Sequence, residues 1–117
     1  LMGQENAEST GTRQLSGVGG QMDFLEGAYR SKGGKGFICI NSSRVTKDGE
    51  RKSNILATIP GGSTISAPRT MIQYVATEYG IASLSGKTLR ERAEAMASIA
   101  HPDFREELMK YAQENFK

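Results

Sequence analysis

The feature that most constrains this chain is a glycine-rich segment at residues 16–20, of sequence SGVGG, that runs directly into a helical pattern. Three glycines in four positions leave the backbone with almost no Cβ cover, so a ligand can approach it closely. Residues 21–31 then place Met22, Leu25 and Tyr29 on one helical face. A glycine turn at a helix N-terminus presents free N–H groups to an anion or a developing oxyanion. The same pattern also fits a tight loop that only joins a strand to a helix.

Composition bounds the class of protein. A chain of 117 residues fits one domain with a modest core. The formal net charge is +2, and no lysine–arginine cluster is interleaved with aromatic residues, so nucleic acid is not the expected partner. One cysteine, Cys39, excludes an intramolecular disulfide and a multi-cysteine metal site. No apolar run reaches the length of a membrane span, and no signal-peptide layout is present. We therefore expect a cytoplasmic protein with no membrane segment and no metal.

The middle of the chain contains short apolar runs between turn signals. Residues 37–40 predict a buried strand, and Cys39 within it is predicted to pack in the core. Asp48-Gly49 predicts a turn, because this pair tolerates positive φ. Further strands are predicted at 53–59, 64–66 and 74–77, with a short helix or a loop at 69–74.

The C-terminal third predicts two helices. Thr88 followed by Glu91 fits a capping box, in which hydroxyl and carboxylate satisfy each other's backbone donors, and a helix is predicted over 88–100. Pro102 suits the first turn of a second helix. The apolar face of that helix is formed by Phe104, Leu108 and Tyr111. Short strands and helices, with a glycine loop at a strand-to-helix junction, indicate an α/β fold.

Four motifs carry a specific resemblance. They are SGVGGQMDF at 16–24, VATEYGIA at 75–82, GKTLRERA at 86–93 and AHPDFR at 100–105. In this order they resemble the C-terminal domain of the acetyl-CoA hydrolase/transferase family, whose closest members include 4-hydroxybutyrate CoA-transferases. The resemblance covers nearly the whole chain. It implies an α/β fold that forms the C-terminal half of a two-domain CoA-transferase, with a sheet flanked by helices.

The resemblance also implies an activity. Members of the family move CoA between an acyl-CoA and a short-chain carboxylate, such as acetate or 4-hydroxybutyrate, through a glutamate that becomes a glutamyl-CoA thioester. That glutamate lies upstream of the matched region, and neither Glu5 nor Glu8 fits its motif. Residues 1–117 are therefore expected to be a C-terminal domain that needs an N-terminal domain for turnover. Coenzyme A is expected as a substrate, with no covalently bound cofactor, and the full-length enzyme as a homo-oligomer.

Individual site residues follow from the same resemblance. The N–H of Gly20 would help form an oxyanion hole, which needs a donor about 3 Å from the oxyanion with no side chain in the way. Ser16, Gly19 and Lys47 match positions near the pantetheine and phosphates of CoA. A lysine suits a diphosphate as a point charge, although Lys47 also fits a solvated surface turn. Glu78 matches a glutamate that orients groups beside the active site, and the alternative is an ordinary strand-end carboxylate.

Other residues leave alternatives open. His101, the only histidine, precedes a helix-starting proline, which favours a structural role over that of a general base. Asn54 stands where the family usually has arginine, so substrate choice is expected to differ if that arginine contacts an acyl carboxylate or CoA. Rival functions are an acyl-CoA hydrolase, a non-catalytic CoA- or phosphate-binding module that uses residues 17–20 as an anion nest, and a scaffold without ligand.

Overall fold

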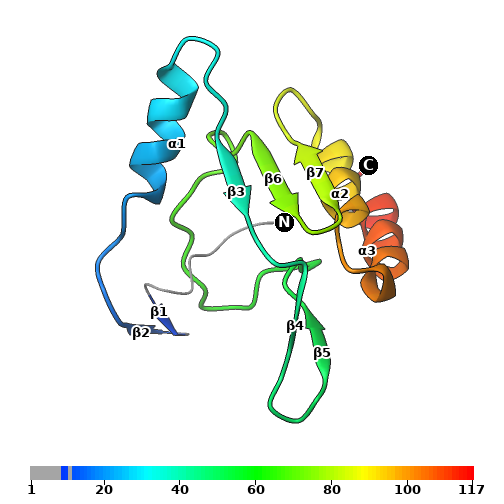
Figure 1. Cartoon of the computed structure of the whole chain (residues 1–117). Coiled ribbons are helices and arrows are strands. Elements are labelled where there is room, and N and C mark those ends of the chain that lie inside the picture. Colours follow the sequence, from blue (N-terminus) through cyan, green and yellow to red (C-terminus); the bar gives the residue numbers. More distant parts are fainter. Residues whose placement is uncertain (1–8, 11) are drawn as a thin grey trace.

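A computed structural model describes residues 9–10 and 12–117 (Figure 1). The elements run in the order β1 (Ser9–Thr10), β2 (Arg13–Gln14), α1 (Gln21–Arg30), β3 (Phe37–Cys39), β4 (Ser43–Val45), β5 (Arg51–Ser53), β6 (Tyr74–Thr77), β7 (Gly80–Ser83), α2 (Leu89–Ser98) and α3 (Pro102–Asn115). Figure 1 shows α2 and α3 together on the β7 side of the sheet and α1 beyond β3 on the other side. The predicted α/β class, with a sheet flanked by helices, is confirmed.

Within the described ranges, the central sheet has the strand order β3-β6-β7. β3 pairs with β6 in parallel, with Ile38 opposite Val75, whereas β6 and β7 are antiparallel. The turn between β6 and β7 consists of Glu78 and Tyr79, and Gly80 follows it with a φ of 145°, which favours glycine. The predicted strand at 74–77 is confirmed, and β7 is an addition that the sequence analysis did not contain.

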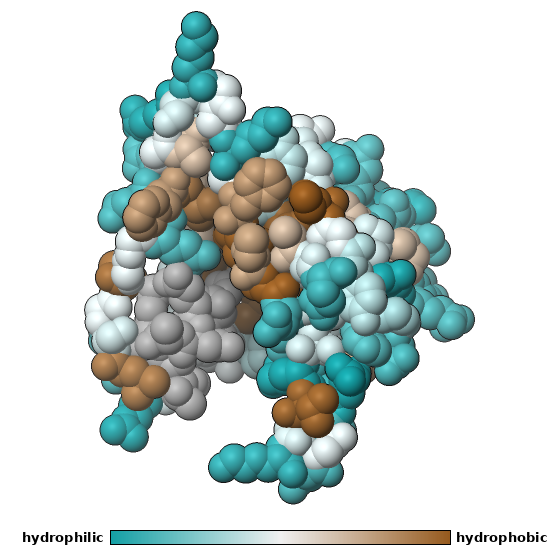
Figure 2. All heavy atoms as spheres, in the orientation of Figure 1, coloured by the Kyte–Doolittle hydropathy of each residue, from teal (hydrophilic) through white to brown (hydrophobic). Residues whose placement is uncertain are grey.

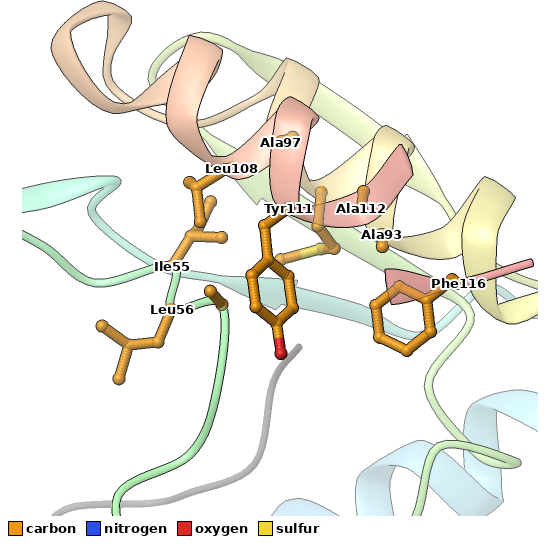
Figure 3. A pocket seen from close by; sticks show the side chains of 10 residues that line it. Ile55, Leu56, Ala93, Ala97, Leu108, Tyr111, Ala112 and Phe116 are labelled. Carbon is orange, nitrogen blue, oxygen red and sulfur yellow. The ribbon is translucent and has the colours of Figure 1, made fainter. Parts of the chain in front are cut away.

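The segment between β5 and β6 differs from the prediction. Residue 53 ends β5, and residues 54–59 form no strand. Ile55 is only 2% exposed and anchors this irregular segment in the core instead. Figure 3 shows its side chain beside Leu108 and Tyr111 of α3. The strand predicted at 64–66 is also wrong, because these residues join no ladder and Ile65 is exposed. Residues 69–71 form a turn rather than a helix.

Strand β3 is an edge strand with one buried side chain. Ile38 is 8% exposed, while Phe37 and Cys39 on either side of it are exposed, because successive side chains of a strand point to opposite faces. The predicted core position of Cys39 is therefore wrong. On the outward face Phe37 stacks on Tyr74 of β6, with ring centroids 4.8 Å apart.

Both C-terminal helices form where the sequence predicts them. Helix α2 lies within the predicted range 88–100, and α3 begins at the predicted Pro102. Thr88 caps α2, since its Oγ1 accepts from the Glu91 N–H at 3.3 Å and the Glu91 carboxylate accepts from the Thr88 N–H at 2.8 Å. His101 caps α3, whose first residue is Pro102, and its Nδ1 accepts from the Asp103 N–H at 3.3 Å. The structural role predicted for His101 is therefore confirmed.

The core joins the sheet to the helices. Its buried members include Ile38, Val75 and Ala82 from the sheet, Leu84 just after β7, Met96 from α2, and Ile99 and Ala100 just after α2. Among the described residues, no helix is long and apolar enough to cross a membrane. Over the same residues, no group of three histidine, cysteine, aspartate or glutamate side chains could hold a metal ion.

Candidate functional site

The glycine loop ends at the N-terminus of helix α1. Gly20 is the N-cap, with φ −86° and ψ 10°, and its carbonyl accepts the Phe24 N–H at 3.0 Å. No side chain among the described residues caps this helix. The first N–H groups of a helix have no intrahelical acceptor, so these donors are open to a ligand. The end of the glycine loop can therefore meet an anion, with Asp23 as the acidic residue in the first turn of the helix.

The space around the loop is open. A Cβ added to Gly17 or Gly19 would have no described heavy atom within 4 Å, and one on Gly20 would lie 3.4 Å from the Phe24 ring. Val18 and Phe24 are 78% and 81% exposed. Figure 2 shows apolar surface across the face where α1 and the central sheet lie side by side. Such an apolar face beside backbone donors is typical of a surface that another molecule or domain covers.

The second part of the candidate site is the turn between β6 and β7. Both carboxylate oxygens of Glu78 accept hydrogen bonds from Ser42, from its N–H at 2.9 Å and from its hydroxyl at 2.6 Å. These two donors, followed by the backbone N–H of Glu78 itself and by a weaker attraction to His101, hold the pKa of Glu78 below its ordinary value. Glu78 is itself exposed, and it is therefore an ionised, oriented hydrogen-bond acceptor.

The same turn is fixed from the helical side. The Thr77 hydroxyl donates to the Ile99 carbonyl at 2.6 Å, and the Tyr79 N–H donates to the Thr77 hydroxyl at 3.1 Å. The Tyr79 ring meets the His101 ring edge-on at 5.7 Å, and the Arg105 guanidinium carbon lies 5.0 Å from its centroid. The junction of α2 and α3 therefore supports the position of Glu78.

The remaining predicted site residues are dispersed. Ser16 and Gly19 lie with Gly20 in the glycine loop. Lys47 lies in the exposed connection of the β4–β5 hairpin, whose turn is closed by Gly49 with a φ of 82°. Figure 1 shows this hairpin extending away from α1. Asn54 is held near the base of the same hairpin, where its side-chain amide donates to the Asn41 carbonyl at 2.8 Å.

The residue that sequence analysis missed is Ser42. It is completely buried, yet it lies in a polar stretch that predicted no element. The signal that could have identified Ser42 is its position shortly after a strand. Ser42 follows β3 and Glu78 follows β6, and the carboxyl ends of parallel neighbours lie at the same edge of a sheet. The carboxyl ends of parallel strands are where α/β domains commonly bind their ligands.

Fold and site together define an α/β domain that offers backbone donors and a clamped carboxylate to a ligand. The chain belongs to the family of the acetyl-CoA hydrolase/transferase C-terminal domain, whose sequence profile matches residues 1–112. The family predicted from the four motifs is confirmed.

The chain is similar to several named proteins of this family. The chain is 49% identical to butyryl-CoA:acetate CoA-transferase from Anaerostipes caccae over 113 residues, which are 97% of the chain and 25% of that protein. It is 49% identical to 4-hydroxybutyrate coenzyme A transferase from Clostridium kluyveri over 116 residues, 99% of the chain and 26% of that protein. The solved 4-hydroxybutyrate CoA-transferase from Porphyromonas gingivalis matches with a TM-score of 0.65 at 44% identity, covering 83% of this chain and 23% of that one. The chain thus spans about a quarter of the length of these relatives.

Proposed function

We propose that this chain is the C-terminal domain of a CoA-transferase that moves CoA between an acyl-CoA of the acetyl or butyryl type and a short-chain carboxylate. Membership of the family and the names of its similar members support this proposal. The observation that carries it within the molecule is the uncapped N-terminus of α1 at Gly20, where the described residues leave donors open beside an apolar face. A thioester carbonyl and an aliphatic acyl group need this combination of surfaces.

The nucleophile in this proposal is a glutamate outside residues 1–117. Its carboxylate attacks the acyl-CoA carbonyl and releases the CoA thiolate, which then attacks the glutamyl carbonyl, so that glutamyl-CoA forms and the carboxylate product leaves. A second carboxylate reverses these steps. Every attack passes through a tetrahedral species whose oxygen carries negative charge. The Gly20 N–H donates to that oxygen, and the partial positive charge of the α1 N-terminus adds to its stabilisation.

Other residues have supporting roles in the proposal. Glu78 orients the groups that react, as a fixed acceptor that stays ionised at neutral pH. Ser16 and Gly19 contact the pantetheine arm, and Lys47 meets the phosphates of CoA. The N-terminal domain covers the apolar face, and the full-length enzyme assembles as a homo-oligomer. The single cysteine favours a reducing compartment, so we propose the cytoplasm as its location.

The test uses the full-length enzyme that contains this chain. Purified enzyme is incubated with butyryl-CoA and isotopically labelled acetate, and both labelled acetyl-CoA and free thiol are measured. Transfer predicts label in acetyl-CoA with little free thiol. Thiol release without labelled acetyl-CoA would identify a hydrolase, the first alternative, and would contradict the proposed transfer.

The open helix N-terminus also favours a second candidate, a non-catalytic module that binds CoA or phosphate through residues 17–20. Such a module recognises the anion alone, so ADP and CoA would bind with similar affinity. The transferase needs pantetheine contacts as well, so CoA would bind more tightly than ADP. Calorimetric titration of the full-length protein with both ligands separates the two candidates.

A further inference from the structure

We propose that Ser42 is a positioning residue, which fixes the direction of the Glu78 carboxylate during the transfer of CoA. This inference rests on the proposed function, in which Glu78 orients the reacting groups. Ser42 itself needs no contact with substrate, because it acts entirely through Glu78.

The contact between the two residues is bidentate and asymmetric. The Ser42 N–H donates to Oε2 and the Ser42 hydroxyl donates to Oε1, at 2.9 and 2.6 Å. Ser42 is 0% exposed, whereas Glu78 is exposed. A carboxylate has about four lone-pair positions, and these two hydrogen bonds take two of them. The backbone N–H of Glu78 adds a weaker hydrogen bond to the same carboxylate, so about one position is left for a further donor. One fixed serine therefore sets the direction in which Glu78 can accept a further hydrogen bond.

The backbone around Ser42 is itself fixed. Its carbonyl accepts the Asn54 N–H at 2.8 Å, and the Ile40 N–H before it donates to the Ala76 carbonyl at 3.0 Å. Ser42 is thus held between the end of the sheet and the β4–β5 hairpin. A donor that needs no rearrangement when charge develops nearby is what a preorganised site requires.

The charges around Glu78 give this contact a measurable signature. The two Ser42 donors lower its pKa most, and His101, from the junction of α2 and α3, adds a smaller attraction. Near the same junction, the Arg105 guanidinium lies over the Tyr79 ring. Removal of the Ser42 hydroxyl therefore raises the pKa of Glu78 toward its ordinary value. Activity that needs ionised Glu78 is lost as pH falls through that pKa, so the loss begins at higher pH in the variant.

The experiment measures kcat and KM against pH for the full-length enzyme, with labelled acetate as the acceptor. The variants are Ser42→Ala, Glu78→Gln and the double variant. Ser43→Ala is the matched control, because the neighbouring Ser43 hydroxyl accepts from Arg51 at 3.0 Å and makes no described contact with Glu78. We expect Ser42→Ala to lower kcat about tenfold, the usual effect of losing a hydrogen bond to a charged group. We also expect the acid limb of its pH profile of kcat to move to higher pH, while the profile of Ser43→Ala follows that of the wild type.

The double variant separates the two proposals. If Ser42 acts through Glu78, adding Ser42→Ala to Glu78→Gln changes kcat no further. In one outcome, Glu78→Gln is impaired but the pH profile of kcat for Ser42→Ala equals that of Ser43→Ala. This result overturns the positioning role of Ser42 and leaves the role of Glu78 intact. Wild-type kcat in Glu78→Gln overturns the role of Glu78 itself. If Ser42→Ala does not fold, Ser42→Cys fills the same space with a weak donor and gives the same comparison.

Discussion

The glycine loop and the Glu78 turn are the two halves of the candidate site, and they are built in opposite ways. In the loop, residues 16–20 are all exposed, and two of the three glycines have no described neighbour at the Cβ position. In the turn, Glu78 is held by two donors of Ser42, and Thr77 is tied to the α2–α3 junction. The difference shows that this chain preorganises the carboxylate by itself, whereas the loop presents donors that a ligand or a second domain must enclose.

The largest effect is expected when residues 1–117 are tested alone, because the loop then has no second domain to enclose it. We expect residues 1–117 to release no thiol from acetyl-CoA, to bind CoA weakly and to self-associate, because apolar side chains beside the loop, such as Val18 and Phe24, are exposed. A thiol-release assay and light scattering measure both properties. A compact monomer that releases CoA at an enzyme-like rate would require a nucleophile within these residues.

The next largest effect is expected in the loop. In the full-length enzyme, the branched side chain of Gly20→Val should crowd the thioester carbonyl and displace the N–H donor. We expect kcat to fall about 10²- to 10³-fold, which is the effect of losing one oxyanion donor. Gly20 has a φ of −86°, which any residue can adopt, so the fold should survive. Gly27→Ala is the control, because it adds a Cβ to α1 away from the loop, where no described heavy atom lies within 4 Å. Near-normal kcat in folded Gly20→Val would remove Gly20 from the site.

A smaller effect is expected at the turn. Glu78→Gln preserves the shape of the side chain and removes its charge, so acyl transfer should fall about tenfold, as for a lost charged hydrogen bond. Thermal stability should fall less than activity, because the single side-chain oxygen of glutamine can still accept from one of the two buried Ser42 donors while the other loses its acceptor. Melting temperature and the specific activity of folded protein are measured together. A lower melting temperature with unchanged specific activity would make Glu78 purely structural.

The smallest effect is expected at the N-cap of α2, the helix that leads to the α2–α3 junction beside the Glu78 turn. Thr88→Ala removes the capping box of α2, and the expected cost is about 1 kcal/mol of unfolding free energy. The Glu78 turn should keep its geometry, so kcat should not change. Chemical denaturation gives the first quantity and the exchange assay gives the second. A fall in kcat of folded Thr88→Ala would show that the turn depends on α2 more than its contacts indicate.

The sequence predicted the parts that depend on local pattern. Helix α1, the capping box at Thr88 and the role of His101 all follow from residues within a few positions of one another. Ser42 could not be identified in this way, because its partner lies 36 positions away and only the parallel pairing of β3 and β6 brings them together. The strand predicted at 53–59 was wrong for a similar reason. Ile55 is apolar because it fills a core gap below α3, not because it belongs to a ladder.

The parallel pairing of β3 and β6 also has a consequence for the order of folding. Residues 40–73 must form a closed loop before these strands can meet, and closing a long loop costs entropy that is repaid only afterwards. Helices α2 and α3 are adjacent in the sequence and make local contacts. We therefore expect α2 and α3 to form early and the edge that joins Ser42 to Glu78 to form last. Pulsed hydrogen exchange during refolding should show protection in α2 before β3, and simultaneous protection would contradict this order.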